Sequence, residues 1–326
     1  MRPVKKIRFV DGDPGHRFVL EKSELYRLLS DRYDFQVVDN PDYLIDLGLG
    51  YHHLSYDCIK IFMSSENQVP NFNYFDYAVG FDDLTFGDRY VRIPFYATYK
   101  EYKMLFGREH PDDRELLDRK FCSFVVSNSW GDPIRKRFFE RLSRYKRVDS
   151  GGHWMNNVGG PVADKLDFCR GYKFNIAFEN SIALGYTTEK IVQAYAANSV
   201  PIYYGNPNVG HDFNGQSMVY VKDEDDIERA VEEIVRLDND DAAYLSKCRA
   251  PCLMQPSADY FDQLKIEFFA HIFDQRLDRA RRVADYGYQA VQRKSTKPAM
   301  LLHEFARDSF WFAFDLAHGK IRRPWK

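Results

Sequence analysis

Short, mainly apolar runs, each followed by a helical pattern, constrain the fold of this chain most. Three of them come after residue 120: Phe121–Ser127, which is continuous, Tyr172–Phe178 and Val200–Tyr204. Apolar runs that are too short for helices and do not alternate with polar residues are typical of strands buried on both faces of a parallel sheet. Strands of this kind separated by helices predict a doubly wound α/β fold.

The same pattern occurs twice, on either side of a polar stretch at residues 108–115. The expected elements of the first part are a helix at Ser23–Tyr33 and strands at Lys6–Val10, Phe35–Asp39, Tyr43–Leu47, Lys60–Met63 and Tyr77–Phe81. In the second part we expect helices from Asp132 to Tyr145, Thr188–Ala197 and Asp223–Leu237, and a further strand at Met218–Val221. We therefore predict domains at 1–118 and 119–275, with a helical tail at 276–326. Ligands of such sheets bind at the carboxyl ends of the strands.

The C-terminal region differs in composition. Phe261–Ala284 predicts one long helix, and Met300–Leu316 is rich in Phe, Trp and Leu before a basic end. Two interpretations stay open: a weak peripheral membrane anchor on the inner face of the membrane, or a helix that packs back onto a domain. Asp308 and Asp315 interrupt an anionic-lipid face and favour the second.

Charge and cysteine content exclude several classes of protein. The formal net charge of −2 offers no basic field for nucleic acid. The five cysteines lack the spacing of a zinc site, and we interpret them as reduced thiols in a cytoplasmic protein. The sequence has no signal-like apolar segment and no apolar run of about 18 residues.

Several catalytic motifs are missing from the sequence. No Gly-x-Gly-x-x-Gly follows a predicted strand, and no phosphate-binding Walker loop or Gly-x-Ser-x-Gly elbow occurs. Asp-x-Asp matches begin at Asp11, Asp223 and Asp238, but acidic residues are common and we predict no metal site. His52 and His53 remain candidates for acceptor or metal, although an extended chain would send them to opposite sides.

The segment after the Tyr172–Phe178 run carries the most chemical information. It places Glu179 and Asn180 at the carboxyl end of a strand, and Gly185 permits a tight turn. We expect Thr187 to cap the following helix. A helix N-terminus with Lys190 in its first turn suits a phosphate group, and a nearby carboxylate suits ribose hydroxyls.

These residues also carry a specific resemblance. The runs Tyr-Lys-Phe-Asn-Ile-Ala-Phe-Glu-Asn-Ser, Gly-Tyr-Thr-Thr-Glu-Lys-Ile and Val-Pro-Ile-Tyr-Tyr-Gly-Asn-Pro resemble the α1,3-fucosyltransferases of glycosyltransferase family 10. The run from Ser65 to Asp82 is similar to a motif of the bacterial members. At Thr187 and Tyr204 the family often has Val and Trp.

The resemblance implies two Rossmann-like domains facing a cleft, in the GT-B arrangement. It also implies an inverting enzyme that takes GDP-β-L-fucose in its C-terminal domain and an oligosaccharide or glycolipid acceptor in its N-terminal domain. The expected product is α1,3-linked fucose on O3 of GlcNAc in a Galβ1-4GlcNAc unit, as in Lewis x. The alternatives are an α1,4 linkage, a GT-B transferase for another sugar nucleotide, and an inactive glycan- or nucleotide-binding module.

The resemblance also carries over residue roles. Glu66 corresponds to the proposed catalytic base, and Arg135 to a donor-binding arginine. Lys190 is expected to share the diphosphate with Arg135. We expect further donor contacts from Asn180, Tyr186 and Glu189, whereas Glu179 supports Lys190 or the fold. Two cations can replace a metal electrostatically, so we expect no required cofactor and leave stimulation by Mn²⁺ or Mg²⁺ open.

Overall fold

The computed structural model describes residues 2–12, 19–64 and 66–317, with side chains as far as Phe310. The chain forms two compact units. The N-terminal unit comprises Met1–Gly80, Leu84–Ile93 and Phe261–Lys326, and the C-terminal unit comprises Phe81–Asp83 and Pro94–Tyr260. These ranges differ from the expected 1–118, 119–275 and 276–326, since the chain returns to the N-terminal unit after residue 260.

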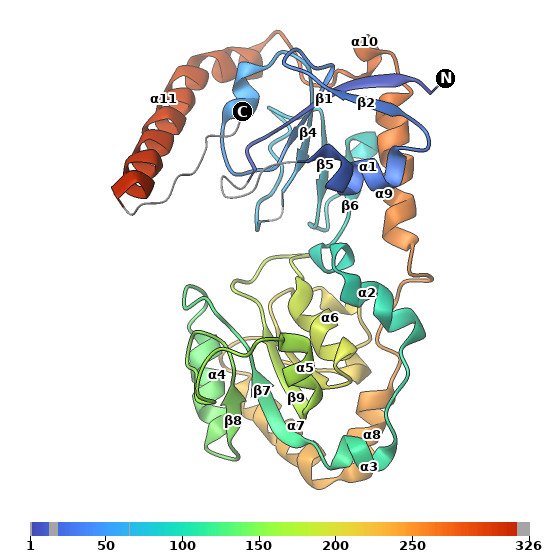
Figure 1. Ribbon diagram of the computed structural model, residues 1–326, viewed down its shortest axis with the longest axis vertical. Coiled ribbons are helices and arrows are strands. Elements are labelled where there is room, and N and C mark those ends of the chain that lie inside the picture. Colours follow the sequence, from blue (N-terminus) through green and yellow to red (C-terminus); the bar gives the residue numbers. More distant parts are fainter. Residues whose placement is uncertain (1, 13–18, 65, 318–326) are drawn as a thin grey trace. The chain divides into compact units, whose positions relative to one another are not determined.

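A six-stranded parallel sheet forms the centre of the N-terminal unit (Figure 1). Its order is β2-β1-β3-β4-β5-β6. The strands are β1 (Val4–Val10), β2 (Asp34–Val37), β3 (Tyr43–Asp46), β4 (Ile59–Met63), β5 (Tyr77–Gly80) and β6 (Tyr90–Arg92). The helices are α1 (Glu24–Leu29), α9 (Tyr260–Phe273), α10 (Leu277–Ala280) and α11 (Tyr288–Ala317). The chain leaves β1 for β2 on one side and returns to β3 on the other, so the topological switch point lies between β1 and β3.

Aromatic packing attaches α9 to this sheet. The Phe273 ring lies 4.7 Å from that of Tyr43 and 5.4 Å from that of Tyr33. The predicted single helix at Phe261–Ala284 is wrong, because α9 ends at Phe273 and α10 follows separately. One oxygen of the buried Asp76 accepts hydrogen bonds from the backbone N–H groups of Arg282 and Val283. In an uninterrupted helix those N–H groups would be bonded to carbonyls one turn earlier.

The C-terminal unit has a five-stranded parallel sheet in the order β11-β10-β9-β7-β8. Its strands are β7 (Lys120–Phe124), β8 (Val148–Ser150), β9 (Tyr172–Phe178), β10 (Val200–Tyr204) and β11 (Val219–Tyr220). Its helices are α2 (Lys100–Met104), α3 (Asp113–Leu117), α4 (Ile134–Ser143), α5 (Lys165–Arg170), α6 (Glu189–Ala196), α7 (Ile227–Asn239) and α8 (Asp241–Arg249). The helices α4 and α7 join one core with the strands, and α5 and α6 contact β9 (Figure 1).

Every residue of β9 is buried, including two polar ones. Asn175 donates hydrogen bonds to Ser123 Oγ at 2.8 Å and to Cys169 Sγ at 3.0 Å. The ammonium group of Lys173 lies 5.3 Å from the centre of the Tyr244 ring. These partners offset the cost of burying polar groups in a central strand.

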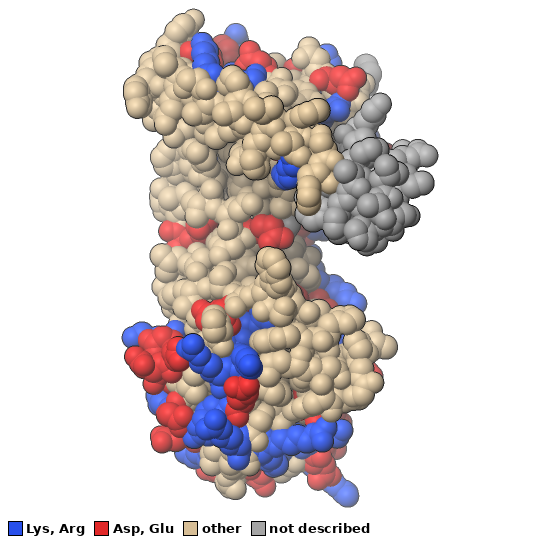
Figure 2. Space-filling model, turned by 90° about the vertical axis from the view of Figure 1, so that its left-hand side faces the viewer, with Lys and Arg blue, Asp and Glu red and all other residues tan. Residues whose placement is uncertain are grey.

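The surface and the cysteines agree with a mixed-charge globular protein. Figure 2 shows Lys and Arg side chains interspersed with Asp and Glu on one face of the C-terminal unit. The ion pairs Arg137–Glu224 and Arg141–Glu228 join α4 to the start of α7 and the segment before it.

All five cysteines are buried and free. Across the described ranges, none of the helices combines the length and the apolar character that crossing a bilayer requires.

The C-terminal helix α11 packs on the N-terminal unit, with Arg307 donating to the Leu49 carbonyl and Arg293 to that of Asn73. Its apolar side chains Leu302 and Phe305 remain exposed. The basic residues of the sequence end, from Lys320 onward, lie outside the described residues. Contact of this helix with a membrane stays a prediction.

Candidate active site

A cavity of about 450 Å³ lies at the carboxyl edge of the C-terminal sheet. The chain leaves β7 for β8 on one side and returns to β9 on the other, so the switch point falls between β7 and β9. Ligands of doubly wound sheets bind at this position. The lining residues follow β7, β8 and β9 or belong to α5, to the segment before it and to α6: Val125, Val126, Ser127, Asn128, Gly151, Gly152, His153, Pro161, Val162, Ala163, Lys165, Asn180, Glu189, Lys190 and Gln193.

Lys190 points to a buried carboxylate beside this cavity. Its Nζ lies 2.9 Å from Glu179 Oε2, 2.9 Å from Thr188 Oγ1 and 3.7 Å from Glu189 Oε1. Burial by itself would lower the pKa of Lys190, but the charges of Glu179 and Glu189 raise it well above its ordinary value. Lys190 is therefore a fixed cation at the cavity wall.

Glu179 is completely buried and occupies the N-terminus of α6. Its carboxylate accepts hydrogen bonds of 2.7 Å from both the backbone N–H and the hydroxyl of Thr188. The prediction that Thr187 caps this helix is wrong. Thr188 occupies the N-cap position, but its side chain accepts no hydrogen bond from the first turn. The helix end therefore already holds one negative group of the protein itself.

Glu189 and Lys165 complete the charged part of the lining. Burial would raise the pKa of Glu189, but Lys190 and Lys165 lower it below its ordinary value. Burial lowers the pKa of Lys165, although Glu189 opposes this effect. The cavity thus presents two ammonium groups and one ionised carboxylate. Sequence reasoning missed Lys165, because nothing near it in the sequence marks the first residue of α5 as part of this site.

Arg135 stands one layer behind the cavity wall. Its side chain is buried, and its guanidinium donates to Asn180 Oδ1 at 2.9 Å and to the Asn128 carbonyl at 2.5 Å. The guanidinium carbon also lies 4.9 Å from the Trp154 ring. Burial lowers the pKa of Arg135, against the opposing charges of Asp132 and Glu179. The structure thus connects Arg135 to Asn180, but it does not place Arg135 in the lining.

Tyr186 lies in an aromatic cluster and not in the cavity lining. Its ring is 5.3 Å from that of Phe81 and 5.8 Å from that of Phe95. The preceding Gly185 has a φ of +81°, and a β-carbon there would stand 2.1 Å from the Phe81 carbonyl oxygen. The tight turn predicted at Gly185 is therefore present, and only glycine fits it without rearrangement.

Glu66 belongs to the N-terminal unit, where it follows β4 and is exposed. Its backbone N–H donates to Ser64 Oγ at 3.0 Å. The position after a parallel strand is as predicted, and its role as a base stays a prediction.

The Asp-x-Asp matches and the histidine pair have different environments. Asp13 lies outside the described residues, Asp238 pairs with Lys146, and Asp240 caps α8. The expectation that His52 and His53 lie in an extended chain is wrong, because both lie in the 3-10 helix η2 (His52–Ser55).

Models of two protein families match most of the chain. The α-(1,3)-fucosyltransferase FucT N-terminal domain matches residues 7–99, and the C-terminal part of glycosyltransferase family 10 (fucosyltransferase) matches residues 117–249. The first range contains Glu66, and the second contains the residues around the cavity. The chain belongs to glycosyltransferase family 10. The resemblance found in the sequence is therefore confirmed.

Relatives and solved structures agree with this family 10 membership. An α-(1,3)-fucosyltransferase FucT of Helicobacter pylori is 38% identical over an alignment of 264 residues, and the match covers 69% of this chain and 55% of that protein. A putative fucosyltransferase R654 of Acanthamoeba polyphaga mimivirus is 26% identical over 215 residues, and the match covers 34% of that protein. The chain therefore spans about half, or less, of the length of these curated relatives.

Crystal structures of an α1,3-fucosyltransferase match nearly the whole family 10 fold. The complex with GDP is 32% identical, with a TM-score of 0.70, and the match covers 88% of this chain and 94% of that one. The complex with GDP-fucose is 30% identical, with a TM-score of 0.69, and the match covers 84% and 92%. The expectation of an α/β fold with two Rossmann-like domains and a helical C-terminal region is confirmed.

Proposed function

We propose that this family 10 chain transfers L-fucose from GDP-β-L-fucose to a glycan hydroxyl with inversion at the fucose C1. The observation that carries the proposal is the cavity at the switch point, where Lys165 and Lys190 stand beside the carboxylate of Glu189. Two cations suit a pyrophosphate, and a carboxylate suits the ribose hydroxyls. A volume of about 450 Å³ lies within the usual range for small-molecule sites.

The donor-binding role extends to residues that line or support this wall. Asn180 contributes a side-chain amide, and Arg135 keeps it in place through the 2.9 Å hydrogen bond. Tyr186 supports the turn that leads into α6. We propose that the fixed ammonium groups stabilise the departing diphosphate without a required metal.

Inversion needs a base for the incoming hydroxyl, and we assign this role to Glu66. The acceptor oxygen forms a bond to C1 while the bond from C1 to the β-phosphate oxygen breaks. The hydroxyl proton passes to the Glu66 carboxylate, and GDP leaves with the negative charge. The acceptor that we propose is O3 of GlcNAc in a Galβ1-4GlcNAc unit, held by the N-terminal unit.

The test is incubation with GDP-fucose and a panel of type 1 and type 2 oligosaccharides, with product linkage determined by NMR. GDP-mannose and UDP-sugars serve as control donors. We expect α-linked fucose on O3 from GDP-fucose alone. Transfer from another donor, or GDP binding without turnover on any acceptor, would overturn the proposal.

Calorimetric GDP titration tests the donor site separately. Lys190→Ala removes a cation from the wall and should weaken binding at least tenfold, because hydrogen bonds to charged groups contribute about 1.5–3 kcal/mol. Arg135→Lys keeps the charge, but the lysine ammonium group lacks the planar fork of the guanidinium and cannot bond both Asn180 and the Asn128 carbonyl. It should also weaken GDP binding, whereas Lys136→Ala, an exposed change on the same helix, should not.

A further inference from the structure

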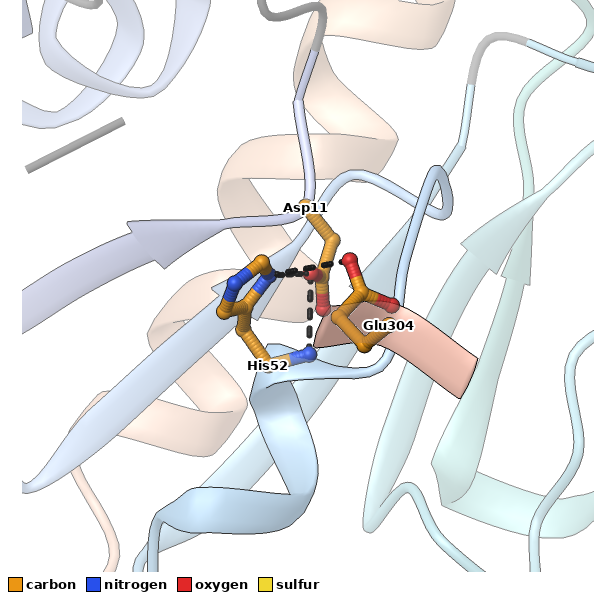
Figure 3. A group of neighbouring side chains, drawn as sticks. All are labelled: Asp11, His52 and Glu304. Carbon is orange, nitrogen blue, oxygen red and sulfur yellow. Dashed lines mark hydrogen bonds and ion pairs between the residues drawn. The ribbon is translucent and has the colours of Figure 1, made fainter. Parts of the chain in front are cut away.

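A second cluster of ionisable side chains lies at the switch point of the N-terminal sheet, and the proposed transfer does not use it. Asp11 follows β1, Asp46 ends β3, His52 and His53 begin η2, and Glu304 comes from α11. All of these except His52 are buried. Figure 3 shows three of them, Asp11, His52 and Glu304. The chain thus brings groups from three distant segments to the carboxyl ends of β1 and β3.

Three of these side chains converge on one point. His52 Nδ1 lies 2.7 Å from Asp11 Oδ1 and 3.4 Å from Glu304 Oε1. One atom from each residue lies within 4.8 Å of the others, and Figure 3 shows the three groups facing one another. Nitrogen and oxygen ligands lie about 2.0–2.2 Å from a zinc ion, so tetrahedral neighbours stand about 3.4 Å apart. The three groups therefore need only small shifts to hold a cation.

The charges in the cluster do not balance without an added cation or protons. Asp11, Asp46 and Glu304 are three carboxylates with little access to water. Arg307 pairs with Glu304, whereas the described groups around Asp11 are the two histidines and two further carboxylates, Asp46 and Glu304. Buried carboxylates without a partner charge are costly, and metal coordination is one of the usual solutions.

Asp46 and Asp11 compete for the same ring nitrogen of His53. The Oδ2 of Asp46 is buried and accepts no hydrogen bond from the described residues, although His53 Nδ1 lies 2.8 Å away. The same nitrogen lies 3.2 Å from Asp11 Oδ2. One ring nitrogen carries at most one hydrogen and cannot donate to both carboxylates. A cation on Asp11 would free that hydrogen for Asp46.

We propose that Asp11, His52 and Glu304 bind one divalent transition-metal ion, with His53 and Asp46 holding Asp11 in place. One imidazole and two carboxylates suit Zn²⁺ or Mn²⁺ better than Mg²⁺. The ion joins α11 to the ends of β1 and β3, so its role is structural. This proposal is independent of the donor site in the C-terminal unit.

The test uses the full chain, stripped with EDTA and then titrated with Zn²⁺ by calorimetry, with metal content measured after dialysis. We expect about one equivalent of tightly bound zinc and a higher melting temperature. His52→Ala and Glu304→Gln should each weaken binding more than tenfold. Asp46→Asn should weaken it about 10–100-fold, as changes to groups that orient metal ligands do. Glu21→Gln, an exposed carboxylate change in the same unit, is the control.

The His52 variant keeps the test decisive, because the His52 side chain is 47% exposed and its loss should not unfold the unit. An unchanged circular dichroism spectrum and unchanged GDP affinity will verify this. Zinc binding that is equally tight in His52→Ala and Glu21→Gln would overturn the proposal, as would the absence of saturable binding to the wild type. Neither result bears on fucosyl transfer, which is measured separately.

Discussion

The substitution Glu179→Gln tests whether a buried charge organises the donor site. Glu179 is completely buried, and its Oε2 accepts from both Lys190 and the Thr188 hydroxyl. Glutamine keeps the shape but removes the charge. Lys190 then loses its charge partner. If the new NH₂ group takes the position of Oε2, it also faces two hydrogen-bond donors, the Lys190 ammonium group and the Thr188 hydroxyl.

The expected loss of stability follows from this geometry. Breaking a buried ion pair by removing one partner costs about 3–5 kcal/mol. The Lys190 side chain is 15% exposed and can turn toward water in the cavity, so we expect a value near the lower end. For a unit of this size, about 3 kcal/mol corresponds to a decrease in melting temperature of about 6–12 °C.

Differential scanning calorimetry measures this decrease, and the transition that GDP raises is assigned to the C-terminal unit. Glu140→Gln is the matched control, because this carboxylate is 52% exposed and its pair with Lys136 spans 3.7 Å. The control should change stability by less than about 0.5 kcal/mol. A Glu179→Gln melting temperature equal to that of the control would refute the argument.

Three further predictions concern the donor cavity and its surroundings. Burial lowers the pKa of Lys165, so its charge is lost at a lower pH than that of an ordinary lysine. As the pH rises, GDP affinity should therefore begin to fall earlier in the wild type than in Lys165→Arg, and equal titration curves would contradict this. Glu66→Gln should decrease turnover by about 10²–10⁴ while calorimetry gives an unchanged GDP affinity; near-normal turnover would exclude Glu66 as the base. Gly185→Ala should lower the free energy of unfolding by at least about 1–2 kcal/mol, because alanine disfavours the left-handed backbone at this position. Urea unfolding measures this loss, with Gly210→Ala as the control, since a β-carbon at Gly210 meets nothing within 4 Å.

The central strands could be predicted from the sequence, and β9 and β10 have the predicted bounds. Both strands are buried on two faces, so apolar residues occur along their whole length and not only at every second position. The strands β6 and β8 were missed because they have three residues each and show no periodicity. The end of the helical segment before Ala284 could not be predicted either, because the N–H groups of Arg282 and Val283 bond to Asp76, which lies more than 200 positions away along the chain.

The site could be predicted where it is local in sequence. Asn180, Glu189 and Lys190 follow one strand and open one helix, and all three line the cavity. Lys165 reaches the same cavity through the topology of the sheet, and no local pattern indicates it. Arg135 was expected at the phosphate, but its hydrogen-bond partners, Asn128 and Asn180, place it behind the wall.

The balance of charge at the cavity is a property of tertiary structure alone. A helix N-terminus followed by a lysine suggested a free positive site, but Glu179 occupies the helix end and pairs with that lysine. Glu179 and Glu189 together offset most of the charge of Arg135, Lys165 and Lys190. Recognition of a pyrophosphate must then depend on the direction of the ammonium hydrogen bonds more than on net charge. Because direct, partly buried contacts are screened less by salt than long-range attraction, GDP affinity should change little with moderate salt, and a steep decrease would show that net charge dominates.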